Sequence, residues 1–195
     1  MTAISPLQAI HKKGIFGDHH KKNQKDLVNI SELKDLTIVQ VFKYKNSKTE
    51  IKSIQIDNLE IFEESTKVSA NEKTRILWSG PNTWLIISSK ENIAESIKTV
   101  FNNENFAVTD ISHSRSVIQI KGICANEVIK KGCPLNFNNF SKNNCAGSVF
   151  NGITIVVDCV DADKKIFNLI TLRSFGESFY HHITDAALEF GYLGV

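Results

Sequence analysis

The sequence predicts an α+β fold, and three observations carry that prediction. From residue 84 onward, the patterns follow each other as strand, helix, strand, strand, helix, several strands and a final helix. The Gly-Pro-Asn stretch at residues 80–82 is a strong turn signal between two apolar strand patterns. Two stretches, 88–105 and 173–191, place apolar residues at helical spacing. This order favours split strand–helix–strand units like those of ferredoxin-like folds.

The first part of the chain is predicted to be the least regular. Residues 1–35 are polar and carry no sustained period, so we expect a poorly structured N-terminal segment. Strand patterns then cover residues 37–44 and 51–56, and the polar residues between them favour a hairpin loop. Because 195 residues suffice for one well-filled core, we expect residues 36–195 to form a single α+β domain.

Three helices are expected, each with a start or stop signal. The helix within 88–105 begins with a capping box at Ser88, and the last helix begins with another at Ser174. Between them, residues 125–132 form a short helix that ends at Gly132, whose missing Cβ suits the left-handed residue after a helix. The remaining strand patterns follow the chain, with Asn-Gly as a hairpin dipeptide at 151–152, and they cover residues 106–112, 116–121, 145–150, 152–160 and 166–172.

Composition and charge exclude several functions. Lys and Arg number 23 against 21 Asp and Glu, so a net charge of +2 gives no electrostatic reason to expect nucleic acid or an anionic membrane as partner. No apolar run approaches the ~18 to 20 residues that span a bilayer, and the first residues lack a signal-peptide pattern. The four cysteines have no zinc-like spacing, so we expect no metal site and a reduced, cytoplasmic protein.

Polar groups gather between two strands in the segment Asp110, Ser112, His113, Ser114 and Arg115. A Ser-His-Asp catalytic site needs groups that separate segments of the fold hold in one geometry. On an extended strand, Asp110, Ser112 and Ser114 share one face while His113 points to the other. The residues therefore favour a polar turn, in which Ser and Asp satisfy backbone groups, and no catalytic residue is predicted.

Three motifs carry a family resemblance. TDISHSR (109–115), KGCPL (131–135) and the stretch 172–191, which begins LRSF, occur together in this order. They resemble the gamma subunit of heterotetrameric sarcosine oxidase, well over residues 75–191 and weakly over the first 70. Members of that family usually carry Trp in the last helix, where this chain has Tyr-His-His at 180–182, so we expect the contacts of that helix to differ.

The resemblance implies a place in a larger assembly. The parent enzyme demethylates sarcosine oxidatively to glycine, producing hydrogen peroxide, and passes the methyl carbon to tetrahydrofolate or releases it as formaldehyde. The resemblance implies that FAD, FMN, NAD, tetrahydrofolate and zinc belong to the alpha, beta and delta subunits. This chain is then a noncatalytic, structural partner of those subunits. The implied fold is that of the folate-binding domain of glycine-cleavage aminomethyltransferase.

Two other functions stay open. A folate- or pterin-binding module would use Asp110 to accept hydrogen bonds from a pterin, and Arg115 or Arg173 to meet a glutamate tail. For both arginines, the alternative is an ion pair with a carboxylate of this chain or of a partner. The other function is the small subunit of a related dehydrogenase acting on N-methylglutamate. Self-association of the isolated chain as a homo-oligomer is compatible with the role as an assembly subunit.

Overall fold

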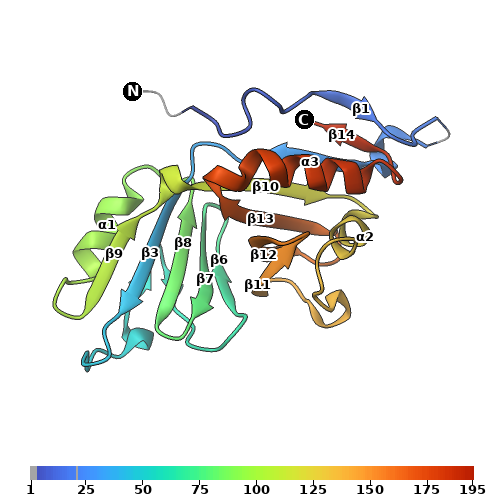
Figure 1. Ribbon diagram of the computed structural model, residues 1–195. Coiled ribbons are helices and arrows are strands. Elements are labelled where there is room, and N and C mark those ends of the chain that lie inside the picture. Colours follow the sequence, from blue (N-terminus) through green and yellow to red (C-terminus); the bar gives the residue numbers. More distant parts are fainter. Residues whose placement is uncertain (1–3, 21) are drawn as a thin grey trace. The chain divides into compact units, whose positions relative to one another are not determined.

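The computed structural model describes residues 4–20 and 22–195 and confirms the α+β class (Figure 1). The chain divides into two compact units, which differs from the single domain expected from the sequence. The inserted unit is Asp35–Ser112, and the terminal unit combines the residues up to Lys34 with His113–Val195. The chain leaves the terminal unit after its second strand and returns to it at the polar segment around residue 113.

The inserted unit is built on one antiparallel sheet with a helix, α1 (Ile93–Val100). Over the described residues, this sheet has five strands in the order β6 (Val68–Ala70), β7 (Thr74–Gly80), β8 (Thr83–Ser88), β3 (Thr37–Lys43) and β9 (Phe106–Asp110). The predicted turn at residues 80–82 is confirmed, because β7 and β8 pair across it and Asn82 takes a positive φ of 57°.

The strands β8 and β9, with α1 between them in sequence, form the expected split unit. β3 lies between them and is antiparallel to both, so β8 and β9 run in the same direction. Ile93, Ile97 and Phe101, four residues apart, are buried on one side of the helix and its end. They pack in one cluster with Val41 and Trp84 of the sheet. The helical spacing of apolar residues therefore predicts correctly which side of α1 is buried.

The start of α1 differs from the expected capping box. Ser88 still belongs to β8, where its hydroxyl accepts a hydrogen bond from the backbone N–H of Lys90 at 3.0 Å. Asn92, in the left-handed region at φ 58°, immediately precedes the helix. The box expected at Ser174 is also replaced, because residues 173–175 form a 3-10 turn before the helix begins. Ser88 lies in a strand and Ser174 inside the 3-10 turn, so neither occupies the N-cap position of its helix.

The strand expected over residues 51–56 is only partly present. Ile51–Ser53 form a 3-10 turn, and the short β4 (Gln55–Ile56) pairs with β5 (Leu59–Glu60) rather than with β3. Both edges of β3 are already paired, with β8 on one side and β9 on the other. A strand following β3 in sequence therefore has no edge of β3 left to join.

The terminal unit is built on a larger sheet. In the part of the chain that the structure describes, it has seven strands in the order β1 (Gly14–Phe16), β14 (Tyr192–Gly194), β2 (Val28–Glu32), β10 (Arg115–Lys121), β13 (Ile166–Leu172), β12 (Ile153–Asp161) and β11 (Cys145–Phe150). Neighbours are antiparallel except β14 and β2, which are parallel. The Asn-Gly hairpin at 151–152 is confirmed, with φ of 46° and 83°.

The described part of residues 1–35 differs from the poorly structured segment expected there. It contributes β1 and β2 to the large sheet, and Leu7, Val28 and Ile30 are fully buried. The segment is polar overall because its strands are short and separated by exposed lysines. Its pairing partners β10 and β14 lie far away in the sequence, so a local pattern does not reveal them.

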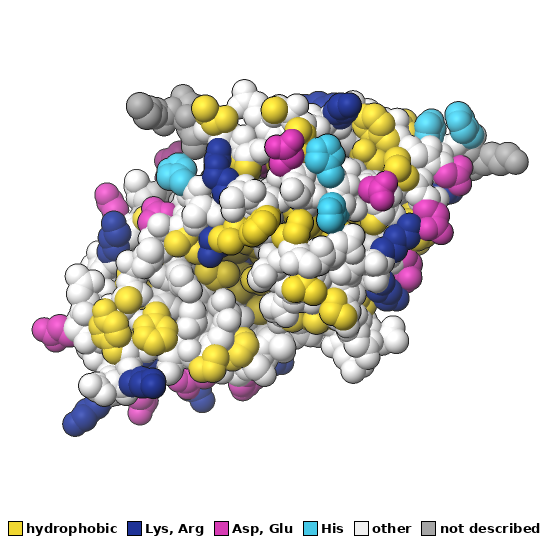
Figure 2. Space-filling model, in the orientation of Figure 1, with side chains coloured by type: hydrophobic (Ala, Val, Ile, Leu, Met, Phe, Trp, Pro, Cys, Tyr) yellow, Lys and Arg dark blue, Asp and Glu magenta, His cyan; other side chains and the backbone are white. Residues whose placement is uncertain are grey.

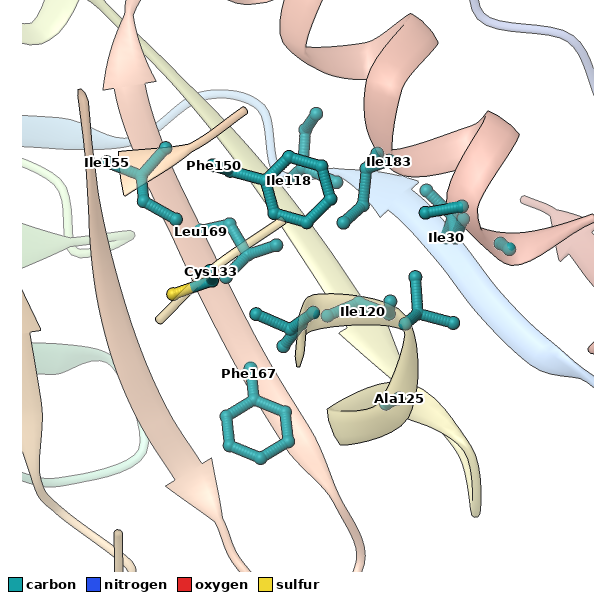
Figure 3. Packing of buried hydrophobic residues seen from close by; sticks show 14 of the residues in the cluster. Ile30, Ile118, Ile120, Ala125, Cys133, Phe150, Ile155, Phe167, Leu169 and Ile183 are labelled. Carbon is teal, nitrogen blue, oxygen red and sulfur yellow. The ribbon is translucent and has the colours of Figure 1, made fainter. Parts of the chain in front are cut away.

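The helices α2 (Ala125–Lys130) and α3 (Gly176–Ala187) pack on the large sheet, and Figure 1 shows α3 lying across β10 and β13. Phe179, Ile183 and Ala187 of α3 are four residues apart and fully buried. Figure 3 shows side chains from the sheet, such as Ile118 and Leu169, in the same cluster as Ile183. This cluster is the core of the terminal unit.

Gly132 follows α2 without the left-handed backbone expected there. A Cβ on this residue would lie 2.7 Å from the side-chain oxygen of Asn151 and 2.9 Å from the ring of Phe150. The glycine is therefore required by a close approach to the β11–β12 hairpin, and not by the ending of the helix.

Candidate functional site

The polar segment after β9 is a turn in which side chains hold backbone groups. The hydroxyl of Ser112 accepts a hydrogen bond from the N–H of Ile38 at 2.9 Å. It donates to Oδ1 of Asp110 at 2.6 Å, and the same oxygen accepts from the N–H of Ser112 at 2.9 Å. Ser112 therefore attaches this turn to the second residue of β3. The prediction of a polar turn is confirmed, and residues 112–114 form a 3-10 turn.

Arg115 begins β10 and belongs to the terminal unit. Its Nη1 donates to the carbonyl oxygen of Ser114 at 3.2 Å and to the hydroxyl of Ser114 at 3.1 Å. Burial lowers the pKa of the Arg115 guanidinium, which still stays protonated at every physiological pH. The side chain is thus a partly desolvated cation that hydrogen-bonds neutral groups.

Arg173 follows β13 and begins the 3-10 turn Arg173–Phe175. Its Nη2 donates to the backbone carbonyl oxygen of Ile4. Since Arg115 is paired in register with Leu172, the two arginines come from the adjoining ends of neighbouring strands. The pairing of β10 with β13 therefore brings together two residues that are far apart in the sequence.

A cleft of about 580 Å³ lies beside Arg173, and we call it the arginine cleft. Every residue that lines it belongs to the terminal unit. Most of these residues are polar, and they are Ser5, Pro6, His113, Ser114, Leu172, Arg173, Ser174 and Glu177. The cleft size is within the range of small-molecule sites.

The structure places the three residues predicted as ligand contacts in two groups. Arg115 and Arg173 lie close together in the terminal unit, and Asp110 belongs to the inserted unit. The Oδ1 atom of Asp110 is engaged by Ser112. Sequence reasoning missed Ser5 and Pro6, which line the arginine cleft, because it expected no structure in that segment. The packing of Gly176 against Pro6 and Ser116, where a Cβ would meet both, fixes this segment beside α3.

A second hollow, of about 530 Å³, lies beside α3 and is lined by Asn151, His181, His182, Thr184, Asp185, Leu188 and Tyr192. Among the described residues, no three His, Cys, Asp or Glu side chains are grouped so that they could hold a metal ion. None of the described helices combines the length and apolar character needed to cross a membrane. Figure 2 shows Lys and Arg interspersed with Asp and Glu, so the face in view carries no field of a single sign.

The fold is of the α+β class and is similar to that of an aminomethyltransferase. It is similar, with a TM-score of 0.63, to the glycine cleavage system aminomethyltransferase T from Bartonella henselae. That similarity covers 88% of this chain and 49% of the other at 9% sequence identity, and it therefore shows the fold alone.

The family follows from the sequence. The model of the sarcosine oxidase, gamma subunit family matches residues 52–189, and this chain belongs to that family. The resemblance of the three motifs is therefore confirmed. The matched region contains the polar turn, the arginine cleft residues from His113 onward, and all of α3.

Individual relatives agree with this assignment. The sarcosine oxidase subunit gamma of Corynebacterium sp. (strain U-96) is 28% identical over 121 residues, which are 60% of this chain and 58% of the relative. That of Arthrobacter sp. is 27% identical over 124 residues, 62% of this chain and 60% of the relative. The matches thus span about three fifths of these relatives. The heterotetrameric sarcosine oxidase from Corynebacterium sp. U-96 contains a chain with the same fold, at a TM-score of 0.77 and 21% identity, covering 86% of this chain and 87% of that one.

Proposed function

We propose that this chain is a noncatalytic, structural subunit of a heterotetrameric sarcosine oxidase. The family match over residues 52–189 carries the proposal. The geometry of the polar turn supports it, because Ser112 and Asp110 are engaged with the backbone of β3 and with each other. Side chains engaged in this way fix a turn in place, which is the work of a scaffold rather than of a nucleophile and its base.

The assembly would convert sarcosine, dioxygen and water into glycine, formaldehyde and hydrogen peroxide, or pass the one-carbon unit to tetrahydrofolate. In this proposal the alpha, beta and delta subunits hold FAD, FMN, NAD, tetrahydrofolate and zinc. The role of this chain is to pack against those subunits and hold them in a fixed arrangement. A cytoplasmic location of the assembly belongs to the same proposal.

Co-expression with the neighbouring genes of the locus tests this function. A tag on this chain should recover large flavin-containing partners, and the complex should produce peroxide when sarcosine is added. Omitting this chain should abolish assembly and activity together. N-methylglutamate serves as the alternative substrate, and a preference for it would assign the chain to the related dehydrogenase instead. Purification of the tagged chain without partners would refute the proposal.

We propose, as the second candidate, a module that binds a folate or a pterin. The arginine cleft supports it, since Arg173 could meet a carboxylate there with Arg115 behind it. Asp110 would contact the pterin ring only if the inserted unit faces the same ligand. Calorimetric titration of the purified chain with tetrahydrofolate tests this candidate. Binding at micromolar levels that Arg173→Ala removes would favour it, and no heat of binding would eliminate it.

A further inference from the structure

Two arginines of the terminal unit have no carboxylate partner among the residues that the structure describes. Within the described part of the chain, neither Arg115 nor Arg173 forms an ion pair. Several lysines of the same unit do form ion pairs, among them Lys22, Lys130 and Lys131. Glu177 lines the arginine cleft together with Arg173, and it does not pair with it. An internal ion pair, one of the alternatives left open for both arginines, is therefore not what holds them.

The hydrogen bonds of Arg115 do not fully compensate the hydration that its guanidinium loses on burial. Its guanidinium is partly withdrawn from water, and its hydrogen bonds go to the carbonyl and hydroxyl oxygens of Ser114. Neutral acceptors compensate the lost hydration of a cation only in part. A carboxylate entering the cleft would contribute the opposite charge that the chain itself does not supply.

Apolar side chains lie around the same arginines. Leu172 is 41% exposed and lines the arginine cleft, and Phe175 is 46% exposed two residues after Arg173. Ile4, whose carbonyl oxygen Arg173 binds, is 68% exposed. Single exposed apolar residues are ordinary on protein surfaces, whereas here three of them occur next to Arg173 in sequence or through its hydrogen bond. Ile4 and Phe175 do not line the cleft, so the apolar surface extends beyond what a small ligand in the cleft would cover.

We propose that the arginine cleft is a docking site for a carboxylate side chain of a larger subunit, flanked by apolar residues that cover Leu172 and Phe175. The inference rests on the proposed function, since it names the surface through which the subunit is held. Arg173 forms the ion pair at the surface, and Arg115 adds positive charge from behind Ser114. Aromatic groups and arginines at the centre of an interface supply much of its binding energy.

A binding experiment on the assembled system tests the site. The wild-type chain is immobilised, and each larger subunit, purified by itself, is passed over it. Arg173→Ala should raise the dissociation constant by about thirtyfold, which corresponds to the loss of one partner of a desolvated charge pair. Arg173→Lys keeps the charge and loses the planar fork, so its effect should be intermediate. Lys98→Ala removes an exposed charge from α1 and should bind like the wild type.

A photo-crosslinking residue at Ser174 gives a second measurement that does not depend on the arginine. Ser174 is exposed and lines the cleft, so its replacement should leave the fold intact. Irradiation of the complex should join position 174 to a large subunit, at a peptide that contains Asp or Glu. Crosslinks to no large subunit would overturn the docking site even if Arg173→Ala failed to fold.

The outcomes separate this inference from the function on which it rests. If the wild-type chain binds no large subunit, the proposed function itself fails. If the wild type binds and Arg173→Ala binds within about threefold of it, the subunit role stands and the docking site is wrong. If Arg173→Ala loses tetrahydrofolate while its affinity for the subunits is unchanged, the cleft is a small-molecule site. Strong weakening together with a crosslink at position 174 supports the proposal.

Discussion

The ammonium group of Lys131, one residue past the end of α2, lies 2.6 Å from the carboxylate of Glu189, just beyond α3. The same Nζ donates to the carbonyl oxygen of Ala186 at 2.8 Å and lies 4.8 Å from the ring centre of Phe190. One side chain therefore joins the ends of both helices of the terminal unit.

Lys131→Met should lower the free energy of unfolding by about 1 to 2 kcal/mol, because it removes an ion pair, a cation–π contact and a helix C-terminal cap together. Urea unfolding measures the loss. Lys130→Met is the matched control, since Lys130 makes only an exposed pair with Glu127 on its own helix. Its cost should stay below about 0.5 kcal/mol. Equal costs for the two variants would contradict the role assigned to Lys131.

Asp57, in the turn between β4 and β5, is surrounded by hydrogen-bond donors. Lys90, Asn71 and Thr74 all donate to its carboxylate and lower its pKa from 3.8 to about 2. The unfolded chain then takes up the proton first as the pH falls. The stabilisation is complete above about pH 4 and is lost as the pH falls toward 2.

Asp57→Asn should therefore destabilise the inserted unit at neutral pH, by about 1 kcal/mol, through weaker hydrogen bonds. The difference between wild type and variant should be constant from pH 7 to about pH 4.5 and should shrink between about pH 4 and pH 2.5. Urea unfolding at a series of pH values provides the curve. Asp163→Asn, at an exposed position, is the control, and its difference in unfolding free energy from the wild type should not shrink in acid. If the difference between the wild type and Asp57→Asn grew in acid, the role assigned to Asp57 would be wrong.

Gly17 and Gly152 both have positive φ, 74° and 83°, and they differ in the space around them. A Cβ at Gly17 would lie 2.3 Å from the carbonyl oxygen of Leu188, whereas one at Gly152 would meet nothing within 4 Å. Gly152→Ala should cost about 1 kcal/mol from backbone strain alone. Gly17→Ala should cost about 3 kcal/mol or more, because the backbone after α3 must move as well. Thermal unfolding of the two variants should distinguish the cost of backbone strain from the cost of the steric clash with Leu188.

Ser112 and His113 distinguish a structural turn from a catalytic one. Ser112→Ala should lower the free energy of unfolding by about 1 kcal/mol, since the N–H of Ile38 loses its acceptor. His113→Ala, at an exposed position, should change stability by less than about 0.5 kcal/mol. Neither should alter the peroxide rate per assembled complex. A loss of rate in His113→Ala with normal assembly would instead place a catalytic group in this chain.

Local patterns predicted those parts of the fold that local interactions determine. The strands β11 and β13 occupy the predicted residues, and the hairpins at 80–82 and 151–152 form where the turn residues indicate. The buried sides of α1 and α3 follow the apolar spacing. Each of these features depends on residues within a few positions of one another.

The parts that were missed depend on contacts between distant residues. β2 and β14 are too short to show a sustained period, and they become strands because they pair with each other and with β10 and β1. Gly132 was assigned to a helix end, and its actual constraint comes from the ring of Phe150 on another strand. The capping boxes had suitable residues, but sheet pairing at Ser88 and a 3-10 turn at Ser174 moved the helix starts.

The candidate site also contains one part that local residues determine and one part that depends on contacts between distant residues. The polar turn could be predicted, because Asp and Ser bind backbone groups two residues away. The arginine cleft could not, because it forms where β10 pairs with β13 and where Ser5 and Pro6 return beside α3. Arg115 and Arg173 are both predicted from the sequence as ligand contacts, and the structure places the two together.

Because β2 pairs with β14, the sheet of the terminal unit is completed later during synthesis than the sheet of the inserted unit. Residues 28–30 are made long before residues 192–194, with which they pair. The inserted unit is continuous in sequence, so its own sheet can close while the terminal unit still lacks a strand. In this interval β2 is an open sheet edge that a chaperone or another nascent chain can bind. Capture of the nascent chain by another chain would have its opportunity then, before β14 arrives.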